Sequence, residues 1–167
     1  MSEKDDVYSN ATKYGGIFNF KDFYQFCYDF LSEELGLDIT EKKYEEKIKG
    51  PEKEISVEWA TEKKLTDYFK ANIKVEFAVK GLKNVEINQG GAKVKTNDGS
   101  IKIKIKGTLE KDYNGKFEVT SFQKFLRGIY EKWVIPSRVD DYQTKVFNMC
   151  EKFLKNAKAY LDLEGER

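Results

Sequence analysis

Apolar and polar residues alternate along residues 65–79, and this is the clearest pattern in the chain. The apolar positions are Leu65, Phe69, Ala71, Ile73, Val75, Phe77 and Val79, with Asp67 as the one exception. Side chains on a β-strand point alternately to opposite faces, so this period of two predicts a long strand with one buried face. The pattern recurs at Ile55, Val57 and Trp59 and at Ile101, Ile103, Ile105 and Leu109. Together these segments predict an antiparallel sheet that is buried on one side only.

Turn-forming residues separate the predicted strands. Residues 41–48 fit either a strand or a helix, and we assign them to a strand because Gly50-Pro51 follows as a turn. Gly81 and Asn84 are predicted to end the long strand, and residues 89–91 to turn the chain. Residues 97–99, with the sequence NDG, are a strong hairpin signal. Residues 114–115 predict a further turn, followed by a short strand around residues 117–119.

Three segments have the 3.6-residue period of amphipathic helices. The first begins after Asn19, a good N-cap, and ends at Gly36, a good C-cap. The second carries an apolar stripe over residues 122–133 and is stopped by Pro136. The third begins after Ser137 and runs for about 25 residues, with its apolar stripe extending to Leu161.

The order of these elements predicts the fold class and the domain organisation. We expect residues 1–15 to form a flexible tail and residues 16–167 a single α+β domain. Short connections within the sheet favour an antiparallel meander of five to seven strands. The apolar face of that sheet would be covered by the N-terminal helix and the two C-terminal helices.

Composition narrows the chemistry that the chain can perform. It contains no histidine, so it lacks the usual general base near neutral pH and the commonest zinc ligand. Cys27 and Cys150 lie among apolar neighbours and are predicted to be buried thiols. The carboxylate pairs have no metal-loop spacing, and the glycines have no phosphate-loop context. We therefore predict no catalytic residue, no metal site, no cofactor and no enzymatic activity.

The first residues lack the apolar core of a signal peptide, and no apolar run is long enough to span a membrane. Together with the two cysteines predicted to be unpaired, this favours a cytoplasmic location.

Charge is segregated along the chain although the net charge is only +1. Residues 22–62 contain twelve Asp and Glu against five Lys, whereas residues 70–106 contain nine Lys against three acids. On the expected hairpin, five lysines would project from one wet face and form a candidate anion-binding face: Lys93, Lys95, Lys102, Lys104 and Lys106. Two features argue against nucleic acid as the ligand of this face: the stretch has no Arg, and no aromatic residue lies among those lysines to stack on bases. The alternative is a solvated sheet face whose lysines protect against edge-to-edge pairing.

Aromatic residues make up 14% of the chain, which is more than one core face hides easily. We expect some of them to line a ligand cavity or to form a surface for a partner. The candidates are Phe26, Tyr28, Tyr130, Trp133 and Phe147.

Three segments resemble an uncharacterised family of small archaeal proteins of unknown function. They are residues 20–24 (FKDFY), residues 109–113 (LEKDY) and residues 124–130 (KFLRGIY). The resemblance implies a cytoplasmic archaeal-type protein. It implies no activity, and no binding or catalytic residue carries over from it.

These observations lead to one expected function with two alternatives. We expect a non-enzymatic binding or adaptor module, whose partner is a protein. The first alternative is a carrier of a small apolar ligand held between the sheet and the C-terminal helix. The second is an anion or nucleic-acid binder that uses the lysine-rich sheet face.

Overall fold

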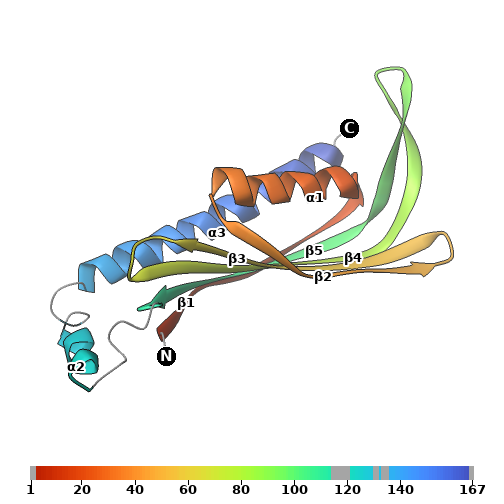
Figure 1. The fold of residues 1–167 in the computed structure, drawn as a ribbon. Helices are drawn as coiled ribbons and strands as arrows, with labels where there is room; N and C mark the ends of the chain where they lie inside the picture. The colour runs from red at the N-terminus through yellow and green to blue at the C-terminus, as the bar shows by residue number, and fades with distance from the viewer. Residues whose placement is uncertain (1–2, 114–120, 130–131, 133–135, 166–167) are drawn as a thin grey trace.

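The computed structural model describes residues 3–113, 121–129, 132 and 136–165. It has five strands: β1 (Glu3–Ile17), β2 (Asp38–Lys49), β3 (Glu52–Lys64), β4 (Phe69–Gln89) and β5 (Ala92–Lys111). They form one antiparallel sheet in the order β1-β5-β4-β3-β2 (Figure 1). The helices are α1 (Phe20–Asp29), which continues as the π-helical turn η1 (Phe30–Glu34), α2 (Ser121–Ile129) and α3 (Pro136–Gly165). The predicted α+β class with an antiparallel sheet is confirmed, and residues 41–48 lie in a strand.

Residues 3–15 do not form the flexible tail predicted for residues 1–15. Residues 3–17 form β1, which pairs with β5 from Glu3 opposite Lys111 to Ile17 opposite Asp98. Only Tyr8 in this strand is buried, so the segment has no apolar alternation by which it could be recognised. An edge strand needs little apolar sequence, because the backbone of its neighbour supplies its hydrogen bonds. The sheet is therefore a four-stranded meander, β2 to β5, with the first strand added beside the last.

The alternating segments have the faces that the sequence predicts. Phe69, Phe77 and Val79 in β4 are buried, as are Trp59 in β3 and Ile103 in β5. However, β4 begins four residues later than the apolar alternation. The Thr66 hydroxyl accepts hydrogen bonds from the backbone N–H of Tyr68 (3.1 Å) and Phe69 (2.9 Å). Residues 65–68 therefore form the turn from β3 to β4, which explains why Asp67 interrupts the pattern.

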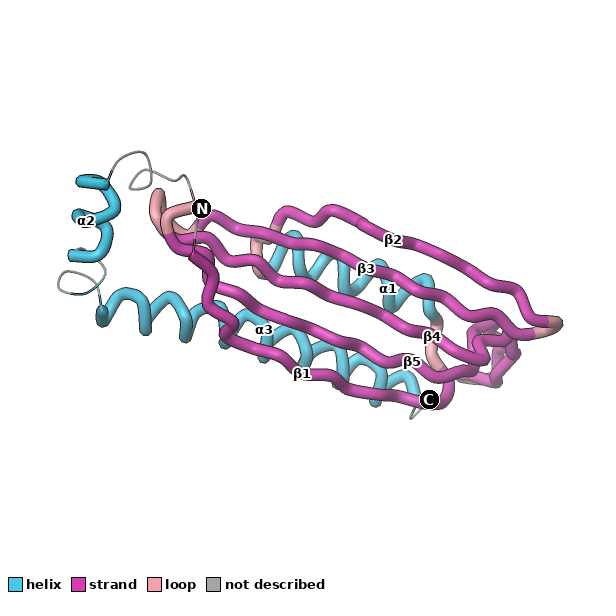
Figure 2. The backbone as a smooth tube through the Cα atoms, turned by 90° about the horizontal axis from the view of Figure 1, so that it is seen from below, coloured by secondary structure: helices cyan, strands magenta, loops and turns pink. Residues whose placement is uncertain are grey.

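The helix layer covers the buried face of the sheet from one side. Figure 2 shows α1 and α3 side by side behind the strands, with α1 over the half containing β3 and α3 over the half containing β1 and β5. The prediction that both C-terminal helices cover the sheet is wrong for α2, which lies beyond the end of the sheet (Figures 1 and 2). The side chains of Phe125, Leu126 and Ile129 in α2 are exposed. These three side chains of α2 therefore lie outside the buried core.

A bend in the sheet lies where the sequence predicts a hairpin and the end of a strand. Both predictions are wrong, because residues 97–99 lie inside β5 and β4 continues past Gly81 and Asn84. The predicted turn at residues 89–91 is confirmed, since β4 and β5 are joined at Gly90 and Gly91. Gly81 has φ 62°, and the register shift between Lys80 and Lys83 places two residues of β4 opposite Gly99. Such a bulge bends a strand pair and increases its twist. The tip of the β4–β5 hairpin therefore rises toward the helix layer, beside the start of α1 (Figure 1).

Candidate functional site

The bent hairpin encloses a cleft of about 970 Å³ against the first turns of α1 and the middle of β2. Its apolar lining combines rings from the helix and strand with aliphatic side chains from the hairpin: Phe20, Tyr24, Tyr44, Leu82 and Val85. Its polar lining comes from the same elements and from β3, and includes Lys21, Glu41, Glu46, Lys53, Asn84, Glu86, Lys95 and Asn97. Small-molecule sites combine apolar walls with a few fixed polar groups in this way.

Asn97 fixes the hairpin to the start of α1. Its side-chain oxygen accepts a hydrogen bond from the backbone N–H of Phe20 (3.1 Å), and its amide group donates to the side chain of Asn84 (2.9 Å). Its backbone carbonyl also accepts from the N–H of Phe18 (3.1 Å). One residue of β5 thus joins both hairpin strands to the helix N-terminus. This places one wall of the cleft at a defined distance from α1.

Glu41 reaches the cleft because of a bulge in β2. The register shifts between Glu41 and Lys43, so that Glu41 lies opposite Trp59 and Tyr44 lies opposite Val57. In a regular strand two residues three positions apart point to opposite faces. The extra residue at Lys42 places both side chains on the helix side of the sheet.

The carboxylate of Glu41 is held by two neutral donors at a single oxygen. Its Oε1 accepts from the hydroxyl of Tyr24 (2.6 Å) and from the indole N–H of Trp59 (3.2 Å). Within the described part of the chain, Oε2 accepts no hydrogen bond and the carboxylate has no Lys or Arg partner. Burial, followed by the hydrogen bond to Glu41, raises the pKa of Tyr24 to about 12. Tyr24 therefore stays protonated at neutral pH and keeps donating.

Aromatic rings surround this carboxylate. The ring of Tyr24 lies 5.9 Å from that of Tyr44 at 85°, and 5.1 Å from that of the buried Trp59 at 68°. Phe20 lies 6.1 Å from Tyr24 at 52°. The rings meet edge to face or at a tilt, and these arrangements are favourable for aromatic pairs.

A second carboxylate on β2 is already neutralised. Glu46 accepts a hydrogen bond from the Tyr44 hydroxyl (2.9 Å) and pairs with the ammonium of Lys53 at 3.7 Å. Burial, and then the hydrogen bond to Glu46, raises the pKa of Tyr44. Glu46 and Lys53 thus form a compensated pair at the cleft, whereas Glu41 has only neutral partners.

The five lysines of the predicted anion-binding face do not lie together. Lys95 lines the cleft, and Lys93 lies on the same side of β5 because side chains alternate. Lys102, Lys104 and Lys106 project from the opposite, outer face of the sheet. The sequence predicted a turn at residues 97–99, which would have put Lys93 and Lys95 on one strand of a hairpin and Lys102, Lys104 and Lys106 on the other. Instead β5 runs through these residues without a turn, so the odd-numbered and even-numbered lysines project from opposite faces.

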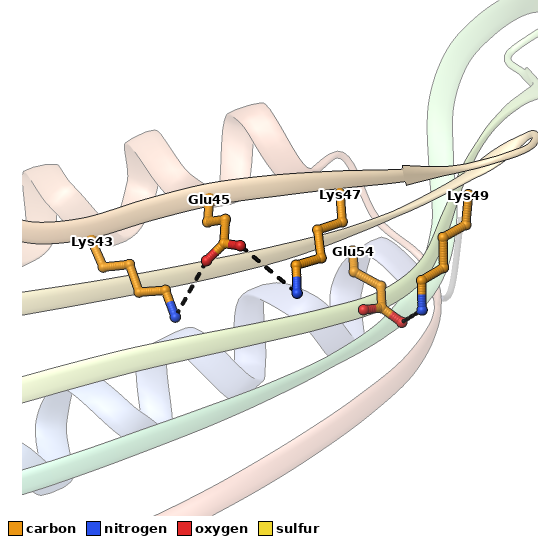
Figure 3. Close-up of polar contacts among 5 residues, drawn as sticks. All are labelled: Lys43, Glu45, Lys47, Lys49 and Glu54. Atoms are coloured by element: carbon orange, nitrogen blue, oxygen red, sulfur yellow. Dashed lines mark hydrogen bonds and ion pairs between the residues drawn. The ribbon is translucent and has the colours of Figure 1, made fainter.

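Acidic residues accompany the lysines of the outer face. The ammonium of Lys106 lies 3.6 Å from the carboxylate of Asp6. Nearby, the ammonium of Lys74 lies 3.1 Å from the carboxylate of Glu76. On β2 and β3, Glu45 pairs with Lys43 (3.5 Å) and Lys47 (3.8 Å), and Glu54 pairs with Lys49 (3.0 Å) (Figure 3). This face therefore carries mixed charge rather than a uniform basic surface.

The predicted aromatic surface is also divided. Phe26 stacks on Tyr160 of α3 with the ring centroids 4.6 Å apart. Tyr28 meets Trp59 edge to face at 5.8 Å, and Phe147 meets Tyr8 in the same way at 5.1 Å. These three rings thus pack on different parts of the fold, and Tyr28 and Phe147 remain partly exposed. Tyr130 and Trp133 lie outside the described residues, as does the predicted strand around residues 117–119.

An apolar carrier site was expected between the sheet and α3, but side chains fill that space. The cleft lies elsewhere, beside α1 and the hairpin. Val146, Cys150, Phe153 and Leu161 of α3 are buried there. Cys27 and Cys150 are both free and buried, as predicted. Burial raises the pKa of Cys150 to about 12, with a smaller effect from Glu151, and burial alone raises the pKa of Cys27 well above its usual value. Neither thiol is ionised at neutral pH.

The residues that define the cleft are not apparent from the sequence alone. Tyr24 falls on the apolar stripe of the helix predicted after Asn19, and Tyr44 falls within residues 41–48, whose pattern fits either a strand or a helix. Glu41 gave no signal, because its position depends on the bulge at Lys42. The sequence nevertheless contains one signal, because Tyr44 is the only aromatic residue in the strongly charged segment that forms β2.

In the part of the chain that the structure describes, no group of three or more Cys, Asp or Glu side chains is arranged to hold a metal ion. Among its helices, none is both long enough and apolar enough to cross a membrane. Comparison with known proteins finds no matching family model, curated protein or solved structure. The resemblance to uncharacterised archaeal proteins therefore stays a prediction.

Proposed function

We propose that this protein is a non-enzymatic binding module whose small-molecule ligand occupies the cleft beside α1. The observation that carries the proposal is the cleft itself, about 970 Å³ with apolar walls and fixed polar groups. Ligand sites typically have volumes of roughly 300–1,000 Å³ and the same mixture of linings. Asn97 and the Tyr24–Glu41 hydrogen bond hold the walls in place before any ligand arrives. Preorganised walls of this kind reduce the entropic cost of binding.

The chemistry of the cleft favours binding over turnover. Tyr24, with its pKa raised to about 12, is a poor proton acceptor at neutral pH. Lys53 is paired with Glu46, and the two thiols lie buried in the core. The protonated Tyr24, the ion-paired Lys53 and the buried thiols are therefore poorly suited to act as a general base or a nucleophile.

The two alternative functions receive less support. A carrier site between the sheet and α3 would need space that Phe153 and its neighbours fill. An anion site on the outer face would have Lys102, Lys104 and Lys106, but with Glu76 and Asp6 among them. The cleft has a shape and a chemistry that neither of these places offers.

A cleft-blocking substitution tests the proposal. Val85→Trp places a large ring in the cleft from a half-buried position on the hairpin. Ala78→Trp is the matched control, because Ala78 is exposed on the outer face of the same strand. Small compounds that bind the wild type in a saturation-transfer NMR screen should still bind Ala78→Trp and should lose binding to Val85→Trp. Equal binding to all three proteins would place the binding site elsewhere.

A further inference from the structure

We propose that the ligand of this cleft is an organic cation, a protonated amine on an apolar stem, whose ammonium group binds Glu41 beside the rings of Tyr24 and Tyr44. This inference rests on the proposed function and adds the chemical class of the ligand. It starts from Glu41, a carboxylate at the cleft whose two hydrogen-bond donors are both neutral.

The hydrogen bonds of Glu41 leave one side of the carboxylate available. Tyr24 and Trp59 both donate to Oε1, at 2.6 and 3.2 Å, and fix the orientation of the group. Neutral donors do not cancel its negative charge. Oε2 accepts no hydrogen bond within the described part of the chain, so it is free to accept one from a ligand. A hydrogen bond in which both partners are charged is roughly twice as strong as a neutral one.

The rings beside Glu41 also favour a cation. Tyr24 and Tyr44 line the cleft with their ring centroids 5.9 Å apart and their planes at 85°. The face of an aromatic ring carries negative potential and attracts an ammonium group within about 6 Å. A cation near Oε2 is therefore attracted by the carboxylate and by the neighbouring rings together, whereas an anion there would be repelled by both.

The rest of the cleft fits the apolar stem of such a ligand. Phe20, Leu82 and Val85 supply apolar surface on the walls away from β2. Three lysines and three glutamates line the cleft, so the preference for a cation is local to Glu41 and its rings. Lys53 is paired with Glu46 at 3.7 Å, and Lys95 lies directly opposite Glu86 in the β4–β5 register. Lys21 lies at the start of α1 and forms no ion pair with Glu41.

Three probes of equal length test the charge preference: hexylamine, hexanol and hexanoate at neutral pH. We expect hexylammonium to bind most tightly and hexanoate most weakly, with dissociation constants measured by amide shifts in NMR titrations. Glu41→Gln should weaken hexylammonium binding about tenfold, the equivalent of about 1.4 kcal/mol, and should leave hexanol binding unchanged. Glu45→Gln is the matched control, since Glu45 pairs with lysines on the outer face of the same strand and should have no effect.

A second variant keeps the test valid if Glu41→Gln does not fold. Tyr44→Leu retains the carboxylate and an apolar side chain but removes one ring, and it should weaken hexylammonium binding more than hexanol binding. Equal affinities for hexylammonium and hexanol in the cleft would overturn the cation inference and leave the proposed binding function standing. Tighter binding of hexanoate would also overturn it. Failure of all three probes to perturb residues of the cleft would contradict both proposals.

Discussion

The hydroxyl of Tyr24 in α1 donates a 2.6 Å hydrogen bond to the carboxylate of Glu41 in β2. This contact connects the helix layer to the edge of the sheet and orients a carboxylate at the cleft whose hydrogen-bond donors are both neutral. The bulge at Lys42 brings Glu41 to the helix side, and the packing of Tyr24 against Trp59 positions the donor. The local sequence of an edge strand thus determines the chemistry of a cleft.

Removing this hydroxyl should destabilise the fold measurably. Tyr24→Phe keeps the ring contacts but loses a hydrogen bond to a charged acceptor, so we expect the free energy of unfolding to fall by about 1 kcal/mol. Tyr28→Phe is the control, because the Tyr28 ring also packs against Trp59 and its hydroxyl makes no hydrogen bond within the described residues. Urea denaturation of both variants measures the difference. Similar losses for the two would show that the Tyr24–Glu41 contact contributes nothing.

The same contact should disappear at alkaline pH. The pKa of Tyr24 is raised from 10.0 to about 12, so the folded protein retains a proton that the unfolded chain loses earlier. The resulting stabilisation is fully present below pH 10 and is lost as the pH rises through about 12. We expect the stability difference between wild type and Tyr24→Phe to shrink across this range. The other tyrosines titrate in both proteins, so a constant difference would show that Tyr24 has no raised pKa.

Gly107 should be intolerant of any side chain. A Cβ at this position would lie 2.6 Å from Sγ of Cys150 and 3.1 Å from a methyl group of Val146, where α3 crosses β5. We expect Gly107→Ala to cost about 1–3 kcal/mol, the usual range for overpacking. Combining it with Cys150→Ala should cost less than the sum of the two single changes, because the closer clash is removed. A double-mutant cycle measures this coupling, and strict additivity would contradict the packing described here.

The bend of the sheet should depend on Gly99. A Cβ there would meet backbone atoms of Gly81 and Leu82 at 3.0–3.2 Å, and backbone cannot move aside as a flexible side chain does. We expect Gly99→Ala to cost about 1–3 kcal/mol and to disturb the cleft that the bent hairpin forms. Gly15→Ala, in β1 near the same bend, meets no atom within 4 Å and should change stability little. Equal effects in thermal unfolding would show that the bend does not need Gly99.

The strongly periodic elements are predictable from the sequence because burial fixed their patterns. The alternation from Phe69 to Val79 and the apolar stripe of α3 reflect contacts that each residue makes with the core. The interruption at Gly107 is also explained by packing, since Cys150 occupies the space of the missing side chain. In these segments the local pattern and the tertiary environment agree.

The remaining elements depend on contacts that the local sequence does not record. β1 has one buried residue, Tyr8, and is held by pairing with β5, which is about a hundred residues away in the chain. Residues 97–99 have the composition of a turn, but Gly99 is needed for close approach to Leu82 within a continuous strand. The position of Glu41 depends on a one-residue bulge, and a shift of one residue reverses the face of every side chain beyond it.

An amide shift map of the labelled protein titrated with hexylammonium tests most directly whether the cleft is the binding site. We expect the largest shifts along the cleft, in Tyr24 of α1, Glu41 and Tyr44 of β2, and Leu82 and Val85 of the hairpin. Residues of the outer face, such as Lys104, should not move. Shifts concentrated on the outer face or along α3, with the cleft unchanged, would contradict the assignment of the binding site.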